Sequence, residues 1–256
     1  MFAFLLQVYF DFSGYTDMGI GAARMLGFHL PNNFDLPYVA SKNLIEFWQR
    51  WHITLTTWLR DYVQTPLTGF RASRLRFNIA TLITMTACGL WHGAAWHYVT
   101  WGFAHGVLLV LTREYLQVVK GSQKLKKLHG KKWMIPLACL CTFITVHFTQ
   151  SLFLAKSIDD ALIIMRSMVC YTPSALGLAE MFWHSPVVVP LVLYTLWGLA
   201  FVEIPWLPLK NFKNIGLVKS FFTATPARQY AFLVCIFVAA IGFCPASSSP
   251  FIYFQF

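Results

Sequence analysis

Charged residues are the scarcest class in this sequence. Asp, Glu, Lys and Arg together make up 12% of the 256 residues, whereas soluble domains have roughly 25%. Hydrophobic residues make up 57%, and the mean hydropathy is +0.56. This shortage of charge excludes a disordered chain, a coiled coil and an ordinary water-soluble globule. It favours a multi-span membrane protein, because helices that face lipid need no polar surface.

Several chemical signatures are also missing. None of the six cysteines is spaced as CxxC, so neither a zinc ribbon nor a disulfide framework is expected. The chain has no GxSxG, P-loop or GxGxxG motif. The spacing of His92, His97 and His105 does not suit a common ligand set, and no metal site is predicted. The net charge is +10, but the Lys and Arg residues lie between apolar runs. They therefore indicate membrane orientation rather than nucleic-acid binding.

The apolar runs that are present predict about six transmembrane helices. A span needs roughly 17–25 mostly apolar residues. Basic residues gather in the loops 70–76, 121–132 and 206–229, which are therefore expected in the cytoplasm. Met1 and the tail 245–256 then face outward. The six predicted spans are residues 1–28, 77–96, 97–119, 133–155, 186–204 and 230–244.

Residues 30–70 are too polar to form a further span. Ser41 is predicted to cap one helix over residues 44–62, which would lie in the membrane interface or dip into it. His52 falls on this helix, either bonded to a backbone carbonyl or with a functional role. The apolar face of the predicted helix consists of Leu44, Trp48, Trp51, Leu55, Trp58 and Leu59.

His92 is the strongest candidate for chemistry. It lies inside an apolar run, and an ionisable residue at membrane depth indicates function by default. Asp11 and Asp17 also lie in a predicted span, where a packing network is favoured over catalysis; the expected hydrogen-bond donors are Ser13, Tyr15 and Thr16. His97 is expected at the outer interface, and His105 and His147 are expected to pair with neighbouring helices. On chemistry alone, two interpretations stay open, a general base for acyl transfer and a proton-relay or transport path.

Four stretches carry a specific combination of motifs. They are QVYFDFSGYTDMGIGAARMLGF, FWQRWHITLTTWLRDYVQTPL, GLWHGAAWHYVTWGFAHG and the terminal SPFIYFQF. The motifs RWH, WLRDY and WHG follow one another in this order. By this combination the chain resembles the membrane-bound O-acyltransferase (MBOAT) family, and its alginate O-acetylase branch most closely. Family chains are longer, and these motifs lie in their C-terminal half. The resemblance therefore implies that residues 1–256 form a single membrane domain, the C-terminal part of the family core without its N-terminal spans.

The expected fold is all-α, a polytopic integral membrane protein with interfacial or re-entrant helices and part of the family's tunnel. The resemblance implies a membrane-embedded O-acyltransferase that moves an acetyl group from a cytoplasmic thioester toward hydroxyls of an exported polysaccharide such as alginate. The family's essential histidine corresponds to His92, which would act as base. Its second histidine corresponds to His52, which would orient the acceptor or polarise the carbonyl. The candidate substrate-binding residues in these motifs are Trp48, Gln49, Arg60, Asp61, Trp91 and Gly93.

The resemblance also implies partners. No tightly bound cofactor is expected, and the donor would be acetyl-CoA or an acyl-carrier phosphopantetheine. The expected partners are membrane lipids, a polysaccharide or periplasmic acetyltransferase as acceptor, and an acyl carrier protein, with no nucleic acid. The expected location is the bacterial inner membrane. The alternative functions are a non-catalytic scaffold of a polymer-modification complex and a transporter or proton-relay protein.

Overall fold

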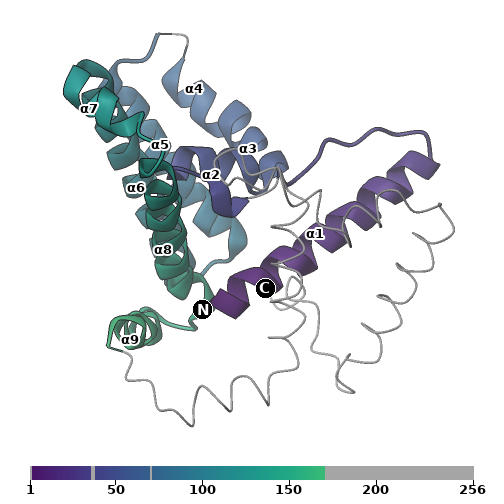
Figure 1. Cartoon of the computed structure of the whole chain (residues 1–256). Coiled ribbons are helices and arrows are strands. Elements are labelled where there is room, and N and C mark those ends of the chain that lie inside the picture. Colours follow the sequence, from purple (N-terminus) through teal and green to yellow (C-terminus); the bar gives the residue numbers. More distant parts are fainter. Residues whose placement is uncertain (1, 36–37, 70, 171–256) are drawn as a thin grey trace, which may run out of the picture. The chain divides into compact units, whose positions relative to one another are not determined.

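The computed structural model describes residues 2–35, 38–69 and 71–170 (Figure 1). Within them every regular element is a helix, so the predicted all-α class is confirmed for this part of the chain. In chain order the elements are α1 (Phe2–Met25), η1 (Tyr38–Ala40), α2 (Leu44–Arg50), α3 (Ile53–Leu59), η2 (Arg60–Gln64), α4 (Thr65–Thr68), α5 (Arg74–His92), α6 (Trp96–Gly121), α7 (Gln123–His129), α8 (Met134–Leu154) and α9 (Ile158–Val169).

Four long helices coincide with the first four predicted spans. They are α1, α5, α6 and α8. Among the described residues, α8 is the one helix whose length and apolar composition would let it cross a membrane. The predicted spans 186–204 and 230–244 lie outside the described residues. The number of six transmembrane helices therefore stays a prediction.

The described residues belong to one compact unit, and residues 172–251, which make up the other, lie outside them. The prediction of a single domain over residues 1–256 stays a prediction.

Helices α5 and α6 form the closest-packed pair of this unit. A Cβ atom on Gly89 would lie 2.2 Å from the backbone oxygen of Tyr98, and one on Gly102 would lie 2.3 Å from that of Met85. Both distances are far below van der Waals contact, so only glycine lets the two backbones approach this closely. Towards the other end of the pair, Asn78 Nδ2 donates to Glu114 Oε1 at 2.8 Å. The two helices are therefore antiparallel, and the start of α5 lies beside the end of α6.

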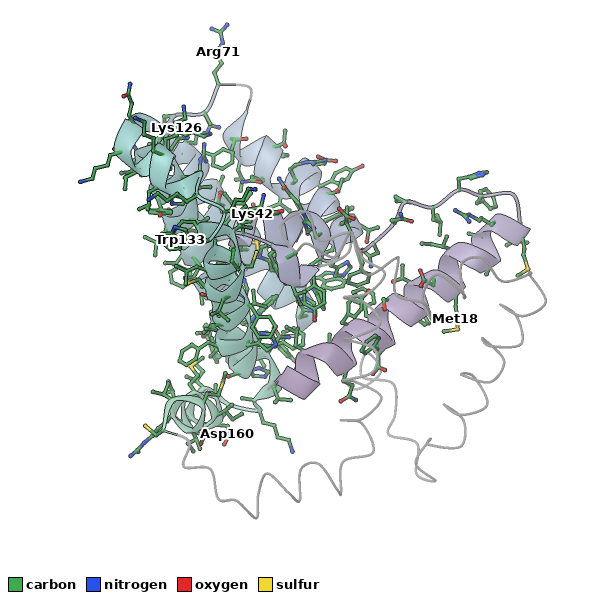
Figure 2. The ribbon with its side chains drawn as sticks, viewed as in Figure 1. Met18, Lys42, Arg71, Lys126, Trp133 and Asp160 are labelled. Atoms are coloured by element: carbon green, nitrogen blue, oxygen red, sulfur yellow. The ribbon has the colours of Figure 1, made fainter. Side chains whose placement is uncertain are left out.

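Helix α8 packs against α6 on one side and α9 on another. His97 Nδ1 donates to the backbone oxygen of Leu152 at 3.1 Å, which ties the start of α6 to the end of α8. Figure 2 shows Arg71 and Lys126 at one end of this helix group and Asp160 at the other. The loops 70–76 and 121–132, predicted to share one side of the membrane, thus lie at the same end of the group.

The single helix predicted over residues 44–62 is wrong. α2 ends at Arg50, Trp51 is extended, and His52 adopts a left-handed conformation before α3 begins at Ile53. After Leu59 the chain continues as a π-helix, η2, instead of a regular α-helix. The apolar periodicity of the segment is present, but it continues across two short helices instead of one. The helix is interrupted because backbone hydrogen bonds from another segment stabilise the break.

The predicted cap of this segment is wrong as well. Asn43, not Ser41, is the N-cap of α2, and its side chain accepts a hydrogen bond from the backbone nitrogen of Glu46 at 2.9 Å. Glu46 in turn accepts from the backbone nitrogen of Lys42 at 3.0 Å. Ser41 instead donates to the backbone oxygen of Tyr38 and closes the turn before the helix. Asn43 and Glu46 have the three-residue spacing of a capping box, with an Asn in place of the Ser.

Candidate active site

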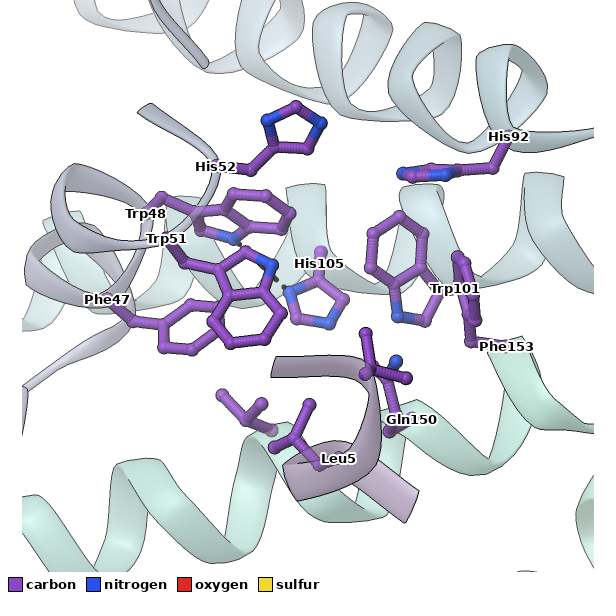
Figure 3. A pocket seen from close by; sticks show the side chains of 12 residues that line it. Leu5, Phe47, Trp48, Trp51, His52, His92, Trp101, His105, Gln150 and Phe153 are labelled. Carbon is purple, nitrogen blue, oxygen red and sulfur yellow. Dashed lines mark hydrogen bonds between the residues drawn. The ribbon is translucent and has the colours of Figure 1, made fainter. Parts of the chain in front are cut away.

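A small pocket brings the two predicted catalytic histidines together (Figure 3). It lies between α1, α2, α5, α6 and α8 and has about 30 Å³ of free volume. That volume holds about two water molecules. We call it the histidine pocket, and its lining residues are Leu5, Val8, Phe47, Trp48, Trp51, His52, His92, Trp101, His105, Val146, Gln150 and Phe153.

His52 reaches this pocket from the break between α2 and α3. Its backbone has φ 47° and ψ 53°, a region that non-glycine residues rarely adopt. Among the described residues it is the one non-glycine residue with a positive φ. The side chain is buried, with Nδ1 at 3.1 Å from Asn33 Oδ1. Nε2 is also buried but has no hydrogen-bond partner among the described residues, so this nitrogen is available to a ligand.

His92 is the last residue of α5. Its half-buried ring contacts Trp91, Trp101 and Phe153, with centroid distances of 4.8, 5.4 and 5.0 Å. Trp91 also lies 6.0 Å from the ring of His52 and is 56% exposed. Figure 3 shows His52 and His92 on the same side of the pocket, above Trp48 and Trp101. Trp91 therefore lies at the surface beside both histidine rings.

A third histidine lies deeper in the pocket. His105 is 1% exposed, and its Nδ1 accepts from Trp48 Nε1 at 3.3 Å. An indole nitrogen only donates, so the neutral His105 ring carries its proton on Nε2, which donates to Thr149 Oγ1 at 2.9 Å. Both ring nitrogens are thus occupied by α2 and α8, as predicted for His105. This histidine holds Trp48 in place instead of offering a free nitrogen.

A larger cavity of about 480 Å³ lies between α2, α3, η2, α5 and α6. Small-molecule sites typically have about 300–1,000 Å³. Its basic lining residues are Arg60, Arg113 and Lys120, of which Arg113 and Lys120 belong to the last part of α6, beside the start of α5. The remaining lining is Ile45, Trp48, Gln49, Thr56, Leu59, Gln64, Phe77, Thr81, Thr84, Met85, Cys88, Leu109, Val110, Leu116 and Gln117. Trp48 therefore lies between this larger cavity and the histidine pocket.

Arg113 is the most informative basic residue of the larger cavity. Its guanidinium carbon lies 3.5 Å from the ring centroid of Phe77, which fixes the side chain against α5. Its Nη1 is buried and has no hydrogen-bond partner among the described residues. A buried, unpaired guanidinium nitrogen is costly. An anionic ligand in the cavity would remove that cost.

Of the remaining predicted substrate-binding residues, two line the larger cavity and three line neither cavity. Gln49 and Arg60 line the larger one. Asp61 lines neither, but accepts a hydrogen bond from Arg60, which lowers the pKa of its exposed carboxyl. Trp91 covers the histidines, whereas Gly93 packs against the ring of Tyr98, which a Cβ would approach to 2.6 Å. Gly93 therefore leaves the space that the Tyr98 ring occupies.

The polar residues predicted within α1, and His147, line neither cavity. Ser13 Oγ donates to the backbone oxygen of Phe10, and Thr16 Oγ1 accepts from Asn33 Nδ2. Ser13 thus bonds within its own helix, and Asp17 is exposed. The packing network predicted around Asp11 and Asp17 stays a prediction. His147 Nδ1 donates within its own helix, to the backbone oxygen of Phe143. In the described part of the chain, no group of three or more His, Cys, Asp or Glu residues could hold a metal ion.

Comparison with known proteins assigns this arrangement to a family. The model of the membrane-bound O-acyltransferase family, MBOAT, matches residues 1–146. This chain belongs to that family. The match contains α1, both histidine motifs, α5, α6 and the first part of α8. The predicted resemblance to the family is therefore confirmed.

Individual relatives narrow the branch. The chain is 40% identical over 159 residues to the probable alginate O-acetylase AlgI of Azotobacter vinelandii, covering 62% of this chain and 30% of that protein. It is 38% identical over 167 residues to the peptidoglycan O-acetyltransferase of Helicobacter pylori, covering 65% and 30%. It is 33% identical over 166 residues to the teichoic acid D-alanyltransferase of Streptococcus thermophilus, covering 60% and 40%. The chain thus spans less than half the length of these relatives.

Three residues of the site were not predicted as functional. Asn33 was only part of the polar segment 30–70, His105 was expected only to pair with a neighbouring helix, and Arg113 was not singled out within the predicted span 97–119. Each acquires its place from a partner distant in sequence, namely His52, Trp48 and Phe77. A polar residue inside an apolar helix was the only local signal, and it applied to His105 and Arg113 but not to Asn33.

Proposed function

We propose that this chain is part of a membrane-embedded O-acyltransferase that moves an acetyl group from a cytoplasmic thioester toward hydroxyls of an exported polysaccharide such as alginate. The observation that carries the proposal is the order of the two cavities along α5 and α6. The basic side of the larger cavity lies toward the end with the basic loops, and the histidine pocket includes the last residue of α5. Donor and acceptor that arrive from opposite faces of a membrane need this order.

The larger cavity suits the thioester donor. Acetyl-CoA and an acyl-carrier phosphopantetheine both combine phosphate with a long, weakly polar arm that ends in a thioester. Arg113 and Lys120 would bind the phosphate, because guanidinium and ammonium groups favour such anions. The apolar lining, with Leu59, Met85 and Leu109, would accept the arm and lead the thioester toward Trp48.

The histidine pair would carry out the transfer. The acceptor hydroxyl gives its proton to the imidazole of His92 while its oxygen attacks the thioester carbonyl. The carbon–sulfur bond then breaks, and the leaving thiolate takes up the proton from His92. His52 would orient the sugar, since it lies in the same pocket with one buried nitrogen unpartnered among the described residues. Positioning of this kind removes a large part of the barrier to a reaction between two molecules.

The proposed location is the bacterial inner membrane, with the basic loops 70–76 and 121–132 in the cytoplasm. The common end of these loops and the positive-inside rule support this orientation. The outward C-terminal tail falls outside the described residues. An acyl carrier protein would deliver the donor on the cytoplasmic side, and a polysaccharide or a periplasmic acetyltransferase would receive the acetyl group on the other. Lipids would surround the helices.

The test is the amount of acetyl ester on exported polysaccharide in cells that produce the wild-type protein, His92→Ala or His129→Ala. A general base contributes roughly 10²- to 10⁴-fold in rate. His92→Ala should therefore lose nearly all acetyl ester, at an unchanged amount of protein in the membrane. His129 lines neither cavity, and His129→Ala is the matched control with wild-type acetylation.

Near-normal acetylation by His92→Ala would refute the proposal. A scaffold would tolerate loss of both His92 and His52. A transporter would give solute or proton flux without new esters on the polymer.

A further inference from the structure

Asn33 is the polar centre of the break that carries His52. Three atoms converge on its side-chain oxygen Oδ1. They are the backbone nitrogen of Thr54 at 3.2 Å, Thr54 Oγ1 at 2.8 Å and His52 Nδ1 at 3.1 Å. Asn33 lies in the segment that connects α1 with η1, far from His52 in the sequence, and is 5% exposed. Its amide is therefore shielded from water, and the amide oxygen is directed at the turn between α2 and α3.

These contacts determine where the proton of His52 lies. A backbone N–H can only donate, so the atom that faces Thr54 must be the carbonyl oxygen of the Asn33 amide and not its nitrogen. A carbonyl oxygen has no proton to give. The contact with His52 Nδ1 is attractive only if Nδ1 carries the proton. In the neutral ring, the lone pair is then on Nε2, the atom that is buried without a partner among the described residues.

Asn33 is itself held firmly on both sides of the break. Its backbone oxygen accepts from the backbone nitrogen of Ile53 at 2.9 Å. Two residues on, the backbone nitrogen of Asp35 donates to the backbone oxygen of Arg50, also at 2.9 Å. Its Nδ2 donates to Thr16 Oγ1 of α1 at 3.4 Å. These bonds offset the strain of the left-handed His52 backbone.

We propose that Asn33 is the positioning residue that fixes the tautomer and the direction of the His52 ring, so that Nε2 accepts a hydrogen bond from a hydroxyl of the acceptor. This inference rests on the proposed acyl transfer and sharpens it. An Nε2 lone pair can accept from a sugar hydroxyl, but cannot donate to a carbonyl oxygen. Of the two roles considered for His52, orientation of the acceptor is therefore the one that this geometry supports. The hydroxyl that it binds would neighbour the one that His92 deprotonates.

A double-mutant cycle on the full chain in membranes tests the proposal. The variants are Asn33→Leu, His52→Ala and the two together, and kcat and KM for acetyl transfer are measured with a soluble polysaccharide acceptor. Asn33→Leu should lower kcat/KM for the acceptor about 10- to 100-fold, because the ring loses its orientation. In the His52→Ala background the same change should have no further effect, because the residue on which Asn33 acts is gone. Equal losses in both backgrounds would overturn the proposal.

A second variant keeps the test valid if Asn33→Leu does not fold. Asn33→Asp keeps the oxygen that Thr54 needs and places a negative charge beside His52 Nδ1. That charge favours the imidazolium, which has no lone pair, so the acid limb of the pH profile of kcat/KM should move to higher pH. His52 packs against Phe12, Thr54 and Trp91, and His92 is the titratable group that acts on it in the described part of the chain. An unchanged profile would refute a direct link between Asn33 and His52.

Thr54→Val is the matched control. It removes one of the three hydrogen bonds to Asn33 Oδ1 and the longer, 3.5 Å contact between Thr54 Oγ1 and His52 Nδ1. It leaves the bond between Asn33 and His52 and adds no charge, so its pH profile should stay at that of the wild type. A shift in Thr54→Val as large as in Asn33→Asp would also overturn the proposal. A wild-type protein that transfers no acetyl group would refute the proposed function itself, which separates the two failures.

Discussion

The histidine pocket and the larger cavity share Trp48 but are constructed differently. The larger cavity lies against the regular helices α5 and α6, whose close contact depends on Gly89 and Gly102. The histidine pocket depends on a broken helix and on side chains from five elements, joined by hydrogen bonds between distant segments. The first has room for a ligand, whereas the second holds about two water molecules.

This difference separates binding from chemistry in the proposed enzyme. A flexible thioester arm needs space and a charged anchor, which helices can provide with ordinary packing. Proton transfer needs nitrogen atoms placed to within a fraction of an ångström, and irregular backbone held by hydrogen bonds gives that placement. Changes at Trp48, Gly89, Arg113 and His105 should show whether the two regions are separate and what keeps them so.

The largest effect is expected from Trp48→Ala, which would join the two cavities. One methylene in a fitted pocket typically changes specificity about 10- to 200-fold. The wild-type protein should therefore prefer acetyl over butyryl thioester, and Trp48→Ala should reduce that preference at least tenfold. The measurement is the ratio of kcat/KM for the two donors. Trp58→Ala, a change of an exposed tryptophan that lines neither cavity, should keep the wild-type ratio.

Gly89→Ala should weaken the helix pair against which the larger cavity lies. The new Cβ would meet a backbone oxygen at 2.2 Å, which cannot move aside as a side chain could. Overpacking of this kind costs about 1–3 kcal/mol, visible as a lower thermal midpoint in detergent. Gly14→Ala on α1 meets nothing within 4 Å and should leave the midpoint unchanged or slightly higher. Equal midpoints for the two variants would contradict the close approach of α5 and α6.

Arg113→Leu should affect only the larger cavity. Loss of one charged hydrogen bond to the donor phosphate should raise the KM for the thioester about tenfold. The histidine pocket is untouched by this change, so kcat should stay near the wild-type value. Arg24→Leu, at the exposed end of α1, controls for loss of one positive charge. A lower kcat with an unchanged KM would contradict this prediction, because Arg113 would then affect the transfer step and not the binding of the donor.

The smallest effect is expected between two changes of His105. His105→Leu leaves the Trp48 indole nitrogen without an acceptor, whereas His105→Asn keeps an oxygen near the position of Nδ1. The leucine variant should be less stable than the asparagine variant by about 1 kcal/mol. Its preference for acetyl over butyryl should also be weaker, because Trp48 is no longer held. Identical stability and donor preference in both variants would show that the hydrogen bond does not position the indole.

Much of the scaffold could be predicted from local pattern. The apolar runs located α1, α5, α6 and α8 to within a few residues, since helix formation over such runs depends on neighbours three and four residues away. The RWH and WHG motifs pointed to His52 and His92, and the structure brings both to one pocket. The cap at Asn43 was missed although its spacing to Glu46 is a local signal, because Ser41 was chosen instead.

By itself, the sequence determined an apolar, helical chain of the MBOAT family with two histidine motifs. Only the tertiary structure decided where the helix over residues 44–62 breaks, which nitrogen of His52 is available, and that Trp48 stands between two cavities. The physical reason is the range of the forces involved. Apolar periodicity acts within one helix and can be seen in a short stretch of residues, whereas the bonds from Asn33 and His105 join segments that only folding brings together.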